Sequence, residues 1–263
     1  MTDALARAVA SLAETAQFLW DKGWAERNGG NISVNVTDAI PAPPGDLSEY
    51  QFLKASLPYP ELSGCALLVT GAGTRMREVA KDPAVNCCVL RIAEQRNGYH
   101  ILWGGKRTGF LPTSELASHL TIHAFLRAND RPEKALLHTH PDELIALTHI
   151  PDSSTTASIN QLLWRMHPEV KIFLPEGINL VPYRPPGSEA LAQATVAALS
   201  QHRAAVWEKH GCVAIGRDPL EAFDLVDMLN KAARIFFLCK GAGLEPQGLS
   251  REQVEELGRL FPC

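Results

Sequence analysis

The feature that most constrains the fold is the alternation of short apolar runs with longer amphipathic segments along the whole chain. Short, largely apolar runs, such as 66–70 and 87–92, are typical of strands. The longer segments between them have the spacing of apolar residues expected of helices. No repeat, low-complexity tract or break in composition divides the 263 residues. We therefore expect one α/β domain over residues 1–263.

Local signals place most of the elements. A first helix is predicted from about Asp3 to Lys22, ending at Gly23, which tolerates a left-handed cap. Asn97-Gly98 predicts a hairpin turn between two strands. The residues Asp218-Pro-Leu-Glu221 have the pattern of a capping box at a helix start. Further helices are predicted at 75–80, from 112–115 to about 127, 188–200 and 219–240, and strands at 32–36, 66–70, 87–92, 99–103, 135–140, 172–174, 178–181, 205–207 and 212–215.

Charge and cysteine content exclude several classes of protein. Lys plus Arg number 25 and Asp plus Glu 29, which gives a net charge of −4 and no basic excess for binding nucleic acid or an anionic membrane surface. No apolar run approaches the roughly 20 residues that span a bilayer, and the N-terminal segment lacks the apolar core of a signal peptide. The 6 cysteines include no Cys-x-x-Cys pattern and do not suggest a disulfide framework. We expect a reducing, cytoplasmic location.

The clearest metal signal is His138-Thr139-His140 at the end of a predicted strand. Because side chains two residues apart leave the same face of a strand, both imidazoles can converge on one ion. His210, in a turn between two short strands, is a candidate third ligand. Nine histidines in the chain make a chance His-x-His common, so spacing alone leaves a metal site and a structural pair both open.

A second histidine pair competes with the first. His119 and His123 have the i, i+4 spacing of a helical zinc pair, but Leu120 stands where the zinc-protease signature requires Glu. We expect these two residues to be histidines on the polar face of a helix or partly buried in it.

Three segments are candidates for binding an anion such as phosphate. Pro112-Thr113-Ser114-Glu115 precedes a helix, whose first N–H groups can bind an anion, although an ordinary N-cap has the same pattern. Asn28-Gly-Gly-Asn31 and Thr70-Gly71-Ala-Gly73 are glycine-rich turns next to strands, which present N–H groups or simply turn the chain. A dinucleotide fingerprint, a P-loop and Gly-x-Ser-x-Gly are absent from the sequence, which disfavours dehydrogenase, NTPase and serine hydrolase functions.

Taken together, these segments resemble the class II aldolase/adducin family. The resemblance is carried by Lys22-Gly-Trp-Ala-Glu-Arg-Asn-Gly-Gly-Asn31, Pro112-Thr-Ser-Glu-Leu116, His138-Thr-His-Pro141, Leu144-Ile-Ala-Leu147 and Lys209-His-Gly211, and it extends over nearly the whole chain. It implies a central, mainly antiparallel sheet flanked by helices, and a homotetramer with active sites near subunit interfaces.

The resemblance also implies roles for individual residues. It makes Glu115 the catalytic acid/base. One Zn²⁺ per subunit would be held by three histidines, and the phosphate and hydroxyl groups of a sugar phosphate by the turn segments. The metal ligands implied are His138, His140 and His210, and the substrate-binding residues are Asn28, Gly30, Asn31, Thr70, Gly71, Thr113 and Ser114.

The implied reaction is the reversible retro-aldol cleavage of a ketose 1-phosphate, with a metal-stabilised enediolate. The Trp-x-Glu-Arg context and the chain length favour L-rhamnulose 1-phosphate, cleaved to dihydroxyacetone phosphate and L-lactaldehyde. Two alternatives stay open: a related aldolase or epimerase for another sugar phosphate, such as fuculose 1-phosphate, and a non-catalytic adducin-like interaction module. In some members a glutamate assigned to the aldehyde half follows the tryptophan matching Trp164. Arg165 stands there, so we assign no group to the C4 hydroxyl.

Overall fold

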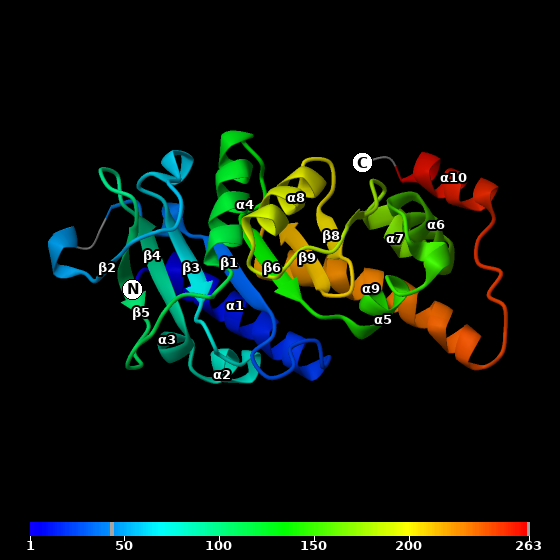
Figure 1. Cartoon of the computed structure of the whole chain (residues 1–263), viewed down its shortest axis with the longest axis horizontal. Helices are drawn as coiled ribbons and strands as arrows, with labels where there is room; N and C mark the ends of the chain where they lie inside the picture. The colour runs from blue at the N-terminus through cyan, green and yellow to red at the C-terminus, as the bar shows by residue number, and fades with distance from the viewer. Residues whose placement is uncertain (43–44, 262–263) are drawn as a thin grey trace. The chain divides into compact units, whose positions relative to one another are not determined.

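The computed structural model describes residues 1–42 and 45–261, and the chain forms two compact units (Figure 1). The first unit contains residues 1–139, 184–196 and 215–222, and the second contains 140–183, 197–214 and the chain from Phe223 onward. Each unit therefore draws on separate stretches of the sequence. The expected α/β class with a mainly antiparallel sheet flanked by helices is confirmed, and the single domain over 1–263 stays a prediction.

The first unit is built on a sheet with the strand order β2-β5-β4-β3-β1-β6, in which every neighbouring pair is antiparallel. Every residue of β3 and β4 is buried, as expected for central strands with a helix layer near each face. The strands are β1 (Asn31–Asn35), β2 (Phe52–Leu53), β3 (Ala66–Thr70), β4 (Cys87–Ile92), β5 (Tyr99–Gly104) and β6 (Ala135–Thr139).

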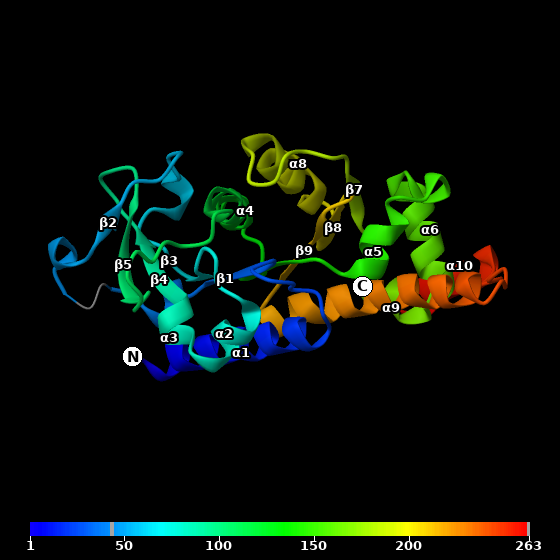
Figure 2. The ribbon, with the colours of Figure 1, turned by 60° about the horizontal axis from the view of Figure 1, so that its bottom comes forward.

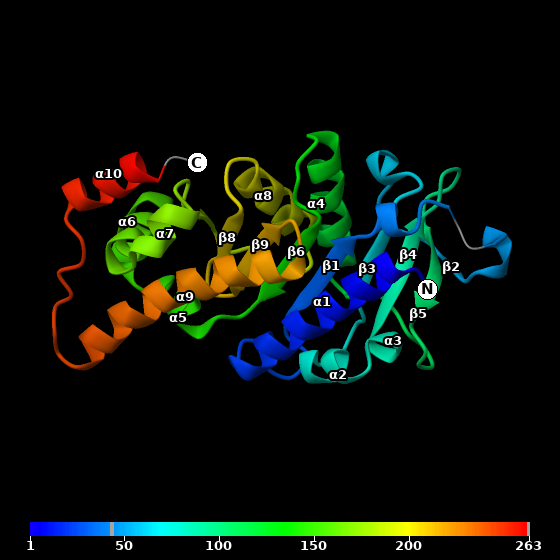
Figure 3. The same ribbon diagram turned by 180° about the vertical axis from the view of Figure 1, so that it is seen from behind.

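Helices lie on both sides of this sheet. Figure 2 shows α1, α2 and α3 on one side of β1 and β3, with α4 on the other, and Figure 3 shows α1 crossing in front of these strands. The α1 helix begins with Thr2 as N-cap, whose hydroxyl accepts from the Leu5 N–H, and Gly23 follows it with φ of +77°. These helices are α1 (Asp3–Asp21), α2 (Met76–Lys81), α3 (Pro83–Asn86) and α4 (Leu116–Ala128).

The second unit combines short strands with helices. Strand β8 pairs in parallel with β7 and antiparallel with β9. Its strands are β7 (Asn179–Val181), β8 (Ala204–Trp207) and β9 (Gly211–Gly216), and its helices are α5 (Asp142–Leu147), α6 (Thr156–Met166), α7 (Pro168–Phe173), α9 (Pro219–Gly241) and α10 (Arg251–Leu260). The end of β9 and the start of α9 belong to the first unit, as does most of α8 (Glu189–Leu199). Short 3₁₀ segments occur at Thr37–Ala39, Leu47–Glu49, Pro60–Leu62 and Pro151–Ser153.

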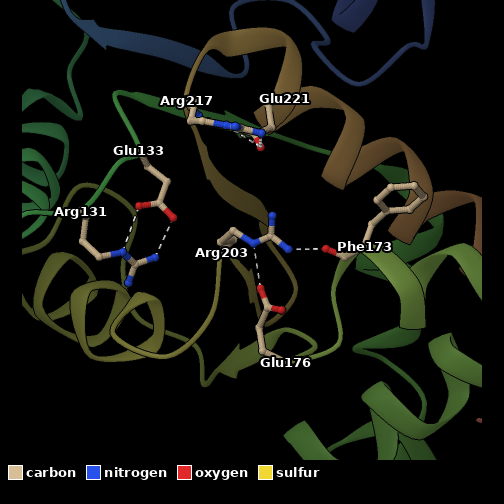
Figure 4. A network of polar contacts seen from close by, with 7 residues as sticks. All are labelled: Arg131, Glu133, Phe173, Glu176, Arg203, Arg217 and Glu221. Atoms are coloured by element: carbon tan, nitrogen blue, oxygen red, sulfur yellow. Dashed lines mark hydrogen bonds and ion pairs between the residues drawn. The ribbon is translucent and has the colours of Figure 1, made fainter. Parts of the chain in front are cut away.

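Arginine side chains fasten the connecting segments within each unit (Figure 4). In the first unit, Arg131 donates two hydrogen bonds to Glu133, at 2.9 and 2.8 Å. In the second, Arg203 donates to Glu176 at 2.9 Å and to the carbonyl of Phe173. The two hydrogen bonds from Arg203, the residue before β8, hold the end of α7 and the chain that follows it.

One local prediction needs correction. Residues 172–174 were predicted as a strand but belong largely to α7, because Pro168 occupies its first turn and three apolar residues are too few to fix a period. At the predicted capping box, the Asp218 carboxylate accepts from the Glu221 N–H at 2.9 Å, as expected of the N-cap residue, and the Glu221 carboxylate accepts from the N–H of Arg217.

Among the helices described, within residues 1–42 and 45–261, none combines the length and hydrophobicity needed to cross a membrane.

Candidate active site

Strand polarity brings the predicted site residues of the first unit to one end of its sheet. Strand β1 runs antiparallel to both β3 and β6, so it begins where they end. Asn31, the first residue of β1, lies directly opposite His138 on β6. The Ile32 N–H donates to the hydroxyl of Thr70, the last residue of β3, at 3.1 Å. Three positions far apart in the sequence therefore meet at the same edge.

Glu115 is the carboxylate at this edge. It is the residue before α4, and its N–H donates to the Thr113 hydroxyl at 3.3 Å. Its Oε2 accepts from Asn31 Nδ2 at 2.7 Å and lies 3.8 Å from His138 Nε2. The Glu115 side chain is 12% exposed, so part of it reaches the surface while Asn31 binds its Oε2 from the interior. A carboxyl group in this position can donate a proton to a molecule bound at the surface or accept a proton from it.

Behind Glu115, α4 contributes two buried histidines. His119 Nε2 contacts Asn31 Oδ1, and the Ser33 hydroxyl lies 2.6 Å from His119 Nδ1 and 2.8 Å from His123 Nε2. Burial, with the His123 charge as second cause, lowers the pKa of His119 to about 3, and burial lowers the pKa of His123 to about 4. The expectation of polar-face or partly buried histidines was wrong, because Asn31 and Ser33 supply buried hydrogen-bond partners.

The candidate phosphate-binding segment around Gly71 is tied into the fold. Gly71 donates its N–H to the Asn86 carbonyl at 2.8 Å, and a Cβ added there would lie 2.5 Å from the Phe110 ring. The Thr113 N–H donates to the Thr70 carbonyl at 2.9 Å. Thr70 and Thr113 are buried, whereas Ser114 is exposed. These contacts make Thr70 and Gly71 supports for the 110–113 segment, and their predicted contact with substrate stays a prediction.

The Asn28–Asn31 turn is shaped by glycine. Gly30 has φ of +77°, and a Cβ on it would lie 3.0 Å from the His138 carbonyl oxygen. The Gly29 N–H donates to the Glu26 carbonyl at 2.7 Å, which closes the turn and leaves Asn28 exposed. The close approach of the turn to β6 therefore requires a residue without a side chain at Gly30.

In the second unit, His140 and His210 face each other with ring centroids 5.5 Å apart. His210 follows a tight turn in which its N–H donates to the Trp207 carbonyl at 3.1 Å and Lys209 has φ of +58°. The Lys209 N–H donates to the Thr148 hydroxyl at 2.9 Å, which ties this turn to the end of α5. The position of His210 is thus set by backbone contacts.

The three predicted ligands form one group. The possible ligand nitrogen atoms of His138, His140 and His210 all lie within 4.8 Å of one another. His138 and His140 are kept close by the chain itself, since they are two residues apart. Three imidazoles form a donor set that suits zinc, which leaves further coordination positions for a substrate. The residues present therefore fit a catalytic metal ion.

Sequence reasoning missed the residues that support Glu115. Ser33 belongs to no motif, and the i, i+4 spacing of His119 and His123 was the only signal that they share a helix face.

Arg165 makes its contacts with the segment before α10 in the second unit, where its guanidinium donates to the carbonyls of Gln247 and Leu249, the latter at 2.8 Å.

Comparison with known proteins identifies the family of this chain. The family model described as "Class II Aldolase and Adducin N-terminal domain" matches residues 10–237. A rhamnulose-1-phosphate aldolase of Bacteroides thetaiotaomicron is 42% identical over 261 residues, which cover 98% of this chain and 95% of the relative. One of Escherichia coli is 35% identical over 245 residues, covering 92% and 89%. The crystal structure of a sugar-phosphate aldolase from Thermotoga maritima superposes with a TM-score of 0.78 at 34% identity, covering 93% of this chain and 99% of that one.

Proposed function

The chain belongs to the class II aldolase and adducin family and is an aldolase, and from that premise we propose that it cleaves L-rhamnulose 1-phosphate reversibly to dihydroxyacetone phosphate and L-lactaldehyde. The observation that carries the choice of substrate is the 42% identity to a rhamnulose-1-phosphate aldolase over nearly the full length of both chains.

Class II aldolases are metal-dependent, and we propose Zn²⁺, one per subunit, as the ion. His138, His140 and His210 would hold it, supported by their mutual spacing and all-imidazole chemistry. When bound, the ion supplies Lewis-acid stabilisation of the negative charge that develops on the substrate ketone oxygen as the carbon–carbon bond breaks.

Glu115 acts as the acid/base in this proposal. Its carboxyl group would protonate the carbon of the enediolate to release dihydroxyacetone phosphate, and would remove that proton in the condensation direction. The hydrogen bond from Asn31 holds one carboxylate oxygen, which limits the rotation of the group and fixes its direction. Asn28, Gly30, Asn31, Thr70, Gly71, Thr113 and Ser114 are proposed to position the phosphate and hydroxyl groups.

We further propose a cytoplasmic homotetramer. The location is supported by the cysteines that the structure describes, none of which is joined in a disulfide, with Cys65, Cys87, Cys88 and Cys212 buried.

The test is cleavage of L-rhamnulose 1-phosphate by the purified protein, followed as release of dihydroxyacetone phosphate. Activity should disappear after chelation and return when zinc is restored, and metal analysis should find one zinc per chain. L-fuculose 1-phosphate, assayed in parallel, should be the poorer substrate. A preference for L-fuculose 1-phosphate would make that ester the assigned substrate. Activity that is unaffected by complete removal of metal would overturn the assigned chemistry.

A further inference from the structure

An unbroken row of hydrogen bonds runs from Glu115 into the buried side of α4. The Asn31 side chain bonds Glu115 with Nδ2 and His119 with Oδ1. The Ser33 hydroxyl then joins His119 to His123, at 2.6 and 2.8 Å. Ser33, His119 and His123 are each no more than 2% exposed, so the row is shielded from water until it reaches His123. That residue lines a cavity of about 280 Å³ with Asn35 and Arg127.

The direction of these bonds follows from Glu115. A carboxylate only accepts, so the Asn31 amide turns its NH₂ toward Glu115 and its oxygen toward His119. His119 must then carry its proton on Nε2, which leaves Nδ1 to accept from the Ser33 hydroxyl. The Ser33 oxygen in turn accepts from Nε2–H of His123. Every donor therefore points toward Glu115, and only this set of tautomers satisfies all four bonds.

The row cannot serve as a proton wire. Passing a proton through Asn31 would require a carboxamide to change tautomer, which is costly compared with the imidazole and hydroxyl steps. The row is also no second metal site, because His119 and His123 direct their bonded nitrogens at Ser33 and Asn31. What remains is a mechanical role. A fixed His119 leaves Asn31 one orientation, and a fixed Asn31 amide holds Glu115 Oε2.

We propose that His119 and Ser33 are positioning residues for the aldolase reaction, which act through the Asn31 amide to hold the Glu115 carboxylate in its reactive orientation. This inference rests on the proposed role of Glu115. Neither side chain is among the proposed metal ligands or substrate-binding residues, so their loss should misdirect Glu115 and leave the metal ligands in place. Because Asn31 is itself one of the proposed substrate-binding residues, a smaller change in KM should accompany the fall in kcat.

The experiment compares two substitutions of one residue. His119→Leu removes the donor to Asn31, and we expect kcat to fall about 10- to 100-fold, the range typical of outer-shell residues, with KM changed less than threefold and full zinc content. His119→Gln places an amide N–H near the former Nε2 and should recover most of the lost kcat. Ser33→Ala removes one buried hydroxyl and little volume, and it should lower kcat in the same way. It serves as the test if His119→Leu folds poorly.

Two controls separate the outcomes. Thr15→Val removes a buried hydroxyl on α1, which donates to the Ser11 carbonyl at 2.9 Å. It should lower the melting temperature about as much as Ser33→Ala does, but leave kcat unchanged. Glu115→Gln should keep zinc and lose turnover. An inactive Glu115→Gln with wild-type kcat in both His119→Leu and Ser33→Ala overturns the positioning role alone. Wild-type kcat in Glu115→Gln overturns the proposed function itself. Equal losses of kcat in His119→Leu and His119→Gln would overturn the role of the hydrogen bond that residue 119 donates to Asn31.

Discussion

At the scale of single residues, the site depends on polar groups that are buried with their partners. An unpaired imidazole or hydroxyl inside a protein costs about 1–3 kcal/mol, and pairing removes most of that penalty. Ser33 and Asn31 provide this pairing for His119 and His123, on the side of α4 that faces β1. Burial keeps both imidazoles neutral, because a charge there would be separated from water.

This burial predicts acid sensitivity of the fold. The pKa of His119 is lowered to about 3 and that of His123 to about 4, below the unfolded value of about 6.5. The unfolded chain therefore binds more protons between these values, and stability falls as pH drops below 6.5. At pH 5 each histidine should cost about 2 kcal/mol of the free energy of unfolding relative to pH 8.

Urea unfolding of the metal-free protein at pH 8 and pH 5 measures this loss. His123→Leu removes one of the two titrating groups, so its free energy of unfolding should change less between the two pH values than that of the wild type. An equal change in both proteins would show that His123 does not titrate as its burial requires.

At the scale of elements, the C-terminal segment is fastened to α6. The Leu249 N–H donates to the Arg165 carbonyl at 2.9 Å, while the Arg165 side chain donates to the carbonyls of Gln247 and Leu249. Gly248 has φ of +62° between them, which turns the chain toward α10. Arg165 thus anchors this segment through both its main chain and its side chain.

Replacing this arginine should release the segment. Arg165→Ala removes both side-chain hydrogen bonds, and we expect faster thermolysin cleavage near the exposed Leu244 and a loss of about 1 kcal/mol in the free energy of unfolding. Arg251→Ala is the matched control, because the Arg251 guanidinium bonds Glu255 within α10. Cleavage at the wild-type rate in Arg165→Ala would mean that the main-chain bond at Leu249 suffices.

At the scale of the whole molecule, the family resemblance predicts four copies of the chain. Large apolar side chains remain exposed in each unit, including Leu111 in the first and Phe173 and Tyr183 in the second. Exposed apolar residues of this size are common in contacts between subunits.

Sedimentation of the purified protein tests the assembly. The expected mass is about four times the 28.7 kDa of one chain, and it should be the same at two concentrations tenfold apart. Glu115→Gln should sediment identically, since it changes one partly buried atom. A mass of one chain at both concentrations would contradict the tetramer.

Local structure and the kinds of chemistry available could be predicted from the order of the residues along the chain. Strands β3 and β4 and the turn at Gly98 follow from periodicity and turn residues. The His-x-His spacing made His138 and His140 candidate metal ligands, and the family resemblance added Glu115 as the candidate acid/base. These signals depend on neighbours along the chain, which the sequence displays directly. Residues 172–174 show the limit, because three apolar residues fit a strand or a helix equally well.

Which residues act together depends on contacts formed in the folded chain. Asn31, Glu115 and His119 meet because β1 begins at the edge where β6 ends and α4 packs against β1, and no spacing in the sequence encodes that encounter. The burial of His119 and His123 and the anchoring role of Arg165 likewise depend on partners up to 90 residues away. Long-range partners are selected by packing and pairing in three dimensions, which is the physical reason that sequence patterns alone do not reveal them.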